Sequence, residues 1–175
     1  MYLFKAEGTI LFNPPDLTNK HILQSEWKRV SMLLTDCDID KYYAWFIKKR
    51  FSLNLTKSIR GTHVTFISEK MDDDTQFQEL AKKLDGKKIT FYYENEPKTN
   101  GEHWWLRVHS YEIEDIRESI GLDKYPYFGL HLTIGRANDN NLEHSKYIAN
   151  VCDRHNLLSK EFRKPIDEYI IKNSY

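Results

Sequence analysis

The sequence predicts a single α+β domain over residues 1–175, with two similar lobes of antiparallel strands and outer helices around a central cleft. Segments with strand and helix patterns alternate along the chain, and each half contains one copy of the pattern Gly-x-His-apolar-Thr-apolar. The hydrophobic content of 40% in 175 residues is sufficient for one core. We find no segment long enough to link a second domain.

The first half begins with strand signals. Residues Tyr2–Phe12 predict a strand that ends at Asn13-Pro14-Pro15, and Val30–Thr35 predict another. A helix capped by Asp36 or Asp38 is expected to run to about Phe51, because large apolar side chains recur at helical spacing.

The next elements are a strand and a second helix. The first copy of the repeated pattern, Gly61–Phe66, predicts a strand, and Thr75–Leu84 predicts a helix from apolar residues spaced by three and four. Asp72-Asp73-Asp74 precedes this helix. Consecutive residues cannot all face one ion, so the triple Asp favours helix capping over a metal site.

The second half repeats this arrangement. Residues Lys88–Tyr93 and Trp104–His109 predict two strands joined by the polar loop 94–103. A short helix is expected at Ile113–Ile120, ended by Gly121. The second copy of the pattern, Gly129–Ile134, predicts a strand, and Asn141–His155 a final helix.

The repeated pattern is the strongest functional signal. Because side chains alternate along a strand, His63 and Thr65 share one face, and so do His131 and Thr133. The other face is apolar in both copies and is expected to pack on a core. The glycine two residues before each His is expected to leave room for a ligand. The two copies can therefore line one cleft.

Two imidazoles suit the cleavage of a phosphodiester by a neighbouring 2′-hydroxyl. One ring takes the hydroxyl proton and the other protonates the leaving oxygen, and histidine can perform either step near neutral pH. Threonine hydroxyls can donate hydrogen bonds to the phosphate oxygens. This scheme requires no metal or cofactor. The plain alternative is that His63 and His131 are ordinary strand residues.

The two motifs resemble those of the 2H phosphoesterase superfamily, over Gly61–Phe66 and Gly129–Gly135. The resemblance implies four catalytic residues, His63, Thr65, His131 and Thr133. The motif wording and the short chain look most like small phage-type members, including the anti-CBASS phosphodiesterases. That implies cleavage of 3′,5′-linked cyclic di- or trinucleotides, which silences a host immune signal.

Four further side chains are candidates for substrate binding. Arg60 and Arg136 flank the motif strands and can contact phosphate, although either can equally be a surface residue. Tyr93 and Trp105 are candidates for stacking on a base, with core packing as the alternative. Trp104 and Trp105 point to opposite faces, so at most one of them is core.

Charge limits the class of partner. The chain has 26 basic and 26 acidic residues, so it lacks the net positive charge of proteins that bind long duplex nucleic acid. A small nucleotide or an RNA end fits better. The alternatives are a 2′,3′-cyclic phosphodiesterase acting on RNA or tRNA ends, a nucleotide-binding module without turnover, or a structural domain with an accidental repeat.

Location and redox state follow from the termini and the cysteines. Residues 1–8 are too short and too soon charged for a signal peptide, and the chain has no long apolar run, so a cytoplasmic location is expected, in the host cell if a phage encodes the protein. Cys37 and Cys152 are isolated in the sequence, which favours free thiols over a disulfide.

Overall fold

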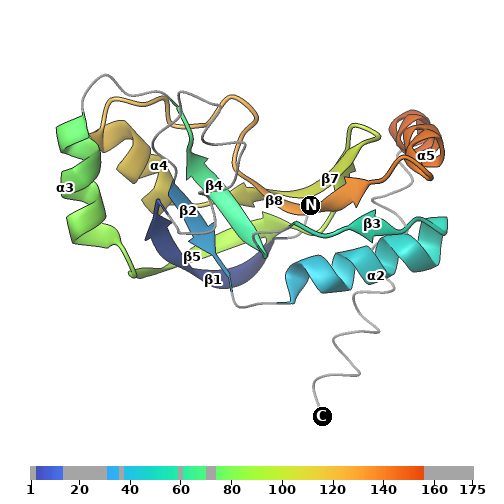
Figure 1. Ribbon diagram of the computed structural model, residues 1–175, viewed down its shortest axis with the longest axis horizontal. Coiled ribbons are helices and arrows are strands. Elements are labelled where there is room, and N and C mark those ends of the chain that lie inside the picture. The colour runs from blue at the N-terminus through green and yellow to red at the C-terminus, as the bar shows by residue number, and fades with distance from the viewer. Residues whose placement is uncertain (1–2, 14–30, 36–37, 59–60, 70–73, 156–175) are drawn as a thin grey trace, which may run out of the picture.

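The computed structural model of the protein describes residues 3–13, 31–35, 38–58, 61–69 and 74–155, which form an α+β fold with an antiparallel sheet (Figure 1). The strands of these ranges are β1 (Leu3–Phe12), β2 (Ser31–Leu34), β3 (Leu55–Thr56), β4 (His63–Ile67), β5 (Lys88–Glu94), β6 (Lys98–Thr99), β7 (His103–His109) and β8 (His131–Ala137). The helices are α2 (Ile39–Phe51), α3 (Asp74–Leu84), α4 (Tyr111–Ser119) and α5 (Leu142–His155).

The order of elements repeats between the two halves. The first half runs β1, β2, α2, β4, α3, and the second runs β5, β7, α4, β8, α5, with the two-residue strands β3 and β6 as additions. Antiparallel pairings join β1, β2, β4, β8, β7 and β5 in that order, and β5 returns to β1. Exchanging β1 with β5, β2 with β7 and β4 with β8 maps each of these six pairings onto another of the six or onto itself. The two halves therefore have matching topology.

One face of these strands carries the core. Ile10, Val64, Leu106 and Leu132, from four different strands, are all 0% exposed. Helix α2 adds Tyr43, Phe46 and Ile47 to the same apolar cluster, and α4 adds Ile113. The helices therefore pack on the apolar face, and the face carrying the alternate residues is left for other contacts.

Helix α5 is anchored to the same core by a polar contact. The indole Nε1 of Trp104, which is 0% exposed, donates to Ser145 Oγ at 2.9 Å. Because a buried indole N–H needs an acceptor, this bond fixes α5 against β7. The ring of Phe51, at the end of α2, lies 5.9 Å from that of Trp104.

Most of the predicted elements are confirmed, and the differences have local causes. Helix α4 begins two residues before its predicted start, because Ser110 accepts a hydrogen bond from the Ile113 backbone N–H and acts as its cap. Asp38 occupies the N-cap of α2, but its carboxylate binds Lys41 at 2.6 Å instead of the backbone. The predicted loop 94–103 contains β6, and β3 was not predicted.

Several predictions concern residues that the structure does not describe. They include the alternative cap Asp36, the thiol of Cys37, the turn at Pro14-Pro15 and the acidic pair Asp72-Asp73. None of the described helices has both the length and the apolar character needed to cross a membrane.

Candidate active site

The two His-Thr motifs have the same local geometry around the imidazole. Nδ1 of His63 lies 2.9 Å from the carbonyl oxygen of Gly61, and Nδ1 of His131 lies 3.0 Å from that of Gly129. Both glycines are in the left-handed region, with φ of 72° and 68°. This backbone conformation presents the carbonyl to the ring two residues later.

The structure adds a conformational role of the two glycines to the predicted space for a ligand, which stays a prediction. A Cβ at Gly129 would meet nothing within 4 Å, and one at Gly61 would meet only Leu34 Cδ1, at 3.8 Å. The glycine is therefore required by its φ and not by a close neighbour.

The Gly contacts determine the form of both imidazoles. A carbonyl oxygen only accepts hydrogen bonds, so each Nδ1 must be the donor. In the neutral ring the lone pair then lies on Nε2, which can take a proton from a substrate and return it later. The two rings are thus held in the same tautomer.

Strand pairing brings the four motif side chains together. Val64 of β4 pairs with Leu132 of β8, and both are 0% exposed on the core face. Paired residues of antiparallel strands share a face, and their neighbours point to the opposite one. His63 and Thr65 therefore share one face with His131 and Thr133; we call it the site face.

The register also orders these side chains. One step from the Val64–Leu132 pair, His63 lies across from Thr133, and Thr65 across from His131. Directly opposed Cβ atoms are about 4.5–5.5 Å apart and diagonal neighbours roughly 7–8 Å apart, so the two imidazoles stand diagonally across the two strands. His63 is 9% exposed, and the other three are half-buried.

Strand β7 extends the site face on the side of β8. Trp105 pairs with Thr133 and Arg107 pairs with His131, so both side chains point toward the motif residues. Trp105 is half-buried, while Trp104 lies in the core, which confirms the predicted alternation. No local sequence pattern marks Arg107. Its spacing from Trp105 places the two on one face, but its position beside His131 requires the strand register.

Arg136 reaches the site face because β8 is irregular. Trp105 pairs with Thr133 but Trp104 pairs with Gly135, so Ile134 is an extra residue in β8. Arg136 then pairs with His103, on the same face as Trp105. Its guanidinium forms an ion pair with Glu102 at 2.7 Å. Arg136 is thus near the site, with its charge balanced.

The other two binding candidates do not join this arrangement. Tyr93 pairs with Val108, a core residue, and stacks on Phe4 with ring centroids 5.6 Å apart, so it belongs to the core face. Its neighbour Tyr92 pairs with His109 and is 40% exposed. Arg60 lies outside the described residues.

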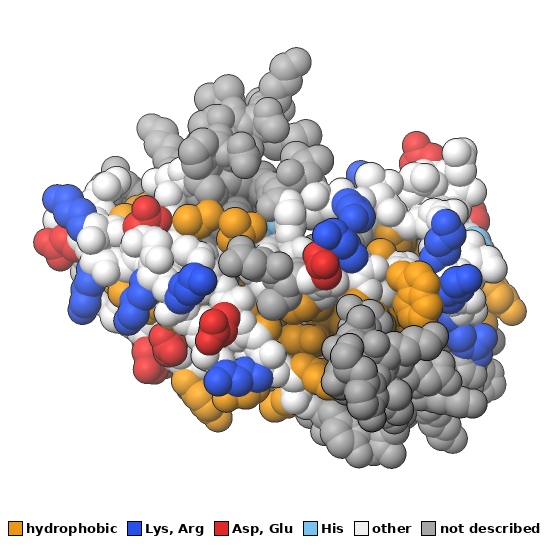
Figure 2. Space-filling view, turned by 90° about the horizontal axis from the view of Figure 1, so that it is seen from below, with side chains coloured by type: hydrophobic (Ala, Val, Ile, Leu, Met, Phe, Trp, Pro, Cys, Tyr) orange, Lys and Arg blue, Asp and Glu red, His pale blue; other side chains and the backbone are white. Residues whose placement is uncertain are grey.

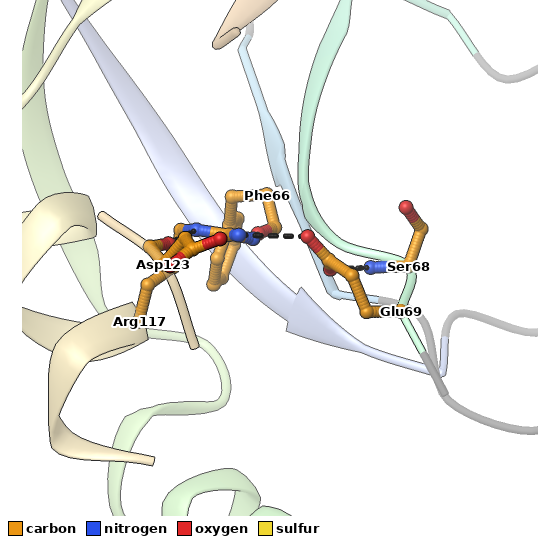
Figure 3. Close-up of polar contacts among 5 residues, drawn as sticks. All are labelled: Phe66, Ser68, Glu69, Arg117 and Asp123. Atoms are coloured by element: carbon orange, nitrogen blue, oxygen red, sulfur yellow. Dashed lines mark hydrogen bonds and ion pairs between the residues drawn. The ribbon is translucent and has the colours of Figure 1, made fainter. Parts of the chain in front are cut away.

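A buried arginine on α4 holds the far end of β4 (Figure 3). Arg117, 1% exposed, donates to the carbonyl oxygens of Phe66 and Asp123. It also donates to Glu69 Oε1 at 2.7 Å. Burial by itself would raise the pKa of Glu69, but hydrogen bonds from Arg117 and from the Ser68 backbone N–H hold this pKa below its usual value.

Comparisons with protein-family models, with curated proteins and with solved structures find no match to this chain. Its function therefore has to be argued from the site itself.

Proposed function

We propose that the protein is a metal-independent phosphodiesterase of the 2H type, with a bilobal fold in which each half of the chain supplies one motif. The observation that carries the proposal is the duplicated His–Gly hydrogen bond, on two paired strands that present His63, Thr65, His131 and Thr133 on one face. Matching tautomers and matching backbone geometry in both copies are expected of a pair that shares acid–base work.

In the proposed reaction the 2′-hydroxyl of the substrate attacks the adjacent phosphorus. One imidazole takes the hydroxyl proton as the 2′-oxygen–phosphorus bond forms. The other imidazole protonates the 5′-oxygen as its bond to phosphorus breaks, and a 2′,3′-cyclic phosphate results. Thr65 and Thr133 donate hydrogen bonds to the non-bridging oxygens, whose charge rearranges in the transition state.

A cyclic di- or trinucleotide is the proposed substrate. The net charge is zero. On the face drawn in Figure 2, Lys and Arg side chains are interspersed with Asp and Glu. Such a distribution suits a compact nucleotide better than a long duplex. Trp105, beside Thr133, can stack on a base. The resemblance of the motifs to small phage-type members supports a role against CBASS-type immunity.

The test is turnover by the purified protein in EDTA. Cyclic dinucleotides and cyclic trinucleotides are incubated beside RNA ending in a 2′,3′-cyclic phosphate, and products are identified by mass spectrometry. We expect linearised cyclic oligonucleotides. His63→Ala and His131→Ala are each expected to lower kcat/KM by at least about 100-fold, the size of a general acid–base contribution.

His144→Ala is the matched control, because His144 is exposed on α5 and, among the residues that the structure describes, its ring binds the Phe51 carbonyl oxygen at 2.8 Å. It should retain wild-type turnover. Turnover of the RNA ends alone would keep the mechanism and assign the alternative substrate. Binding without any product would contradict the enzyme and support a nucleotide-binding module.

A further inference from the structure

A positively charged side chain, that of Arg107, lies next to the proposed catalytic pair and belongs to neither motif. Arg107 of β7 is directly paired with His131 of β8, so its side chain leaves the sheet on the site face. The Cβ atoms of such a pair are about 4.5–5.5 Å apart, well within the reach of an arginine side chain. The guanidinium can therefore lie over the same phosphate that His131 would contact.

The charge of Arg107 is not balanced by a carboxylate within the described ranges. Two other cations on this face have acidic partners, Arg136 with Glu102 at 2.7 Å and Lys98 with Glu96 at 3.6 Å. Glu94 lies beside Arg107 if the β5–β7 register continues, but its Oε1 is bound to His109 at 3.1 Å. Arg107 is exposed, so its charge is available to a ligand.

The chemistry of the motif residues leaves a need for such a charge. Two threonines are neutral, and two imidazoles that share acid–base work carry one positive charge between them during the reaction. A phosphate that becomes five-coordinate carries more negative charge on its non-bridging oxygens than this set can balance. A guanidinium is permanently charged and can bind two phosphate oxygens at once.

We propose that Arg107 is a phosphate-binding residue of this site, which makes the ligand a phosphodiester or another nucleotide phosphate with two free oxygens. The inference rests on the proposed function for its catalytic part, whereas phosphate binding can be measured without turnover. Trp105, two residues earlier on the same face, would contact the attached nucleoside.

The experiment compares Arg107→Gln and Arg107→Lys with wild type. Arg107→Gln is expected to lower kcat/KM by about 10- to 100-fold, mainly through KM. Arg107→Lys should recover only part of the lost kcat/KM, because an ammonium group keeps the charge but cannot bind two phosphate oxygens in the way a planar guanidinium can. The salt dependence of KM should also weaken in Arg107→Gln, since one phosphate contact is lost.

Arg50→Gln is the matched control, because Arg50 lies on α2, which packs on the core face. It should keep wild-type kinetics, and all variants should unfold at the wild-type temperature. Wild-type kinetics in Arg107→Gln, with both histidine variants inactive, would overturn this inference and leave the proposed function intact.

If wild type turns over no substrate, calorimetric binding of a cyclic dinucleotide tests the site alone. Weaker binding by Arg107→Gln than by wild type and Arg50→Gln would support the phosphate site after the enzymatic proposal had failed. Equal binding by all three proteins, or no binding by wild type, would overturn it.

Discussion

Two glycines determine where the imidazoles of the proposed site point. Gly61 and Gly129 have nearly the same positive φ, and each carbonyl accepts the Nδ1 proton of the His that follows. The repeated glycine is visible in the sequence, where it predicts space for a ligand. The left-handed conformation could not be derived from the pattern, because a glycine before a strand is compatible with either explanation.

Replacing a motif glycine should therefore impair activity more than stability. Gly61→Ala and Gly129→Ala are each expected to cost about 1–2 kcal/mol in the free energy of unfolding, because alanine disfavours positive φ. They should also reduce kcat/KM by more than that loss explains, since the imidazole loses its carbonyl partner. Thermal unfolding and steady-state kinetics on the same samples measure both effects.

Gly86→Ala separates these two consequences. Gly86 has φ of 76° and open space around its Cβ position, but it lies in the turn between α3 and β5. It should lose similar stability and retain full activity. An equal loss of activity in Gly86→Ala would show that the carbonyls of Gly61 and Gly129 do not orient the imidazoles of the proposed site.

The candidate substrate-binding residues were harder to predict than the motif. Alternation correctly separated Trp104 from Trp105, but it could not decide which of Tyr92 and Tyr93 faces the core. Arg107 depends on the pairing of β7 with β8, which is a long-range property. Arg136 depends on the extra residue Ile134 in β8, which no local pattern marks.

At the scale of elements, periodicity was sufficient for the long segments. Helices α2, α3, α4 and α5 and the six longer strands match predicted elements because their apolar residues repeat at helical or strand spacing. The strands β3 and β6 have two residues each, too few for any period. They form only because β3 pairs with β8 and β6 pairs with β7.

The ion pair that links α4 to the end of β4, between Arg117 and Glu69, should make the stability of the protein depend on pH. Because the folded pKa of Glu69 is lowered, its contribution to stability is present above the unfolded pKa and is lost as pH falls through the folded value. Glu69→Gln should cost roughly 1.5–3 kcal/mol at neutral pH, the range for a hydrogen bond to a charged group, and should destabilise less at acidic pH.

Denaturant unfolding of Glu69→Gln and wild type at several pH values between neutral and acidic measures this effect. Glu79→Gln is the control, because Glu79 is exposed on α3 and should change stability little at any pH. A constant difference between Glu69→Gln and wild type across the acid range would contradict the role of the Arg117 ion pair.

At the scale of the molecule, the two halves are joined by the sheet itself. β1 and β5 pair along seven residues each, and β4 meets β8 at the site face. The proposed catalytic set therefore takes His63 and Thr65 from one half and His131 and Thr133 from the other. Neither half has a complete site, and each would expose an unpaired strand edge without the other.

Fragments cut at Gly86 test this dependence. Residues 1–86 and 87–175, purified separately, are expected to show no cooperative thermal unfolding and no turnover. Circular dichroism and the nucleotide assay measure the two properties, with the uncut chain as reference. A fragment that unfolded cooperatively by itself would show that the halves are separate folding units.

The matching topology has a consequence for the direction in which a substrate lies. Exchanging the halves maps β2 onto β7, so the strand neighbour of His63 is Leu34, whereas the strand neighbour of His131 is Arg107. The two proposed catalytic histidines thus lie between one apolar and one cationic flank. In the proposed reaction, the 2′ side of the nucleotide differs from its 5′ side. The two unlike flanks would therefore hold the nucleotide in one orientation. The assignment of proton acceptor and proton donor would then be made by the flanking strands and not by the motifs.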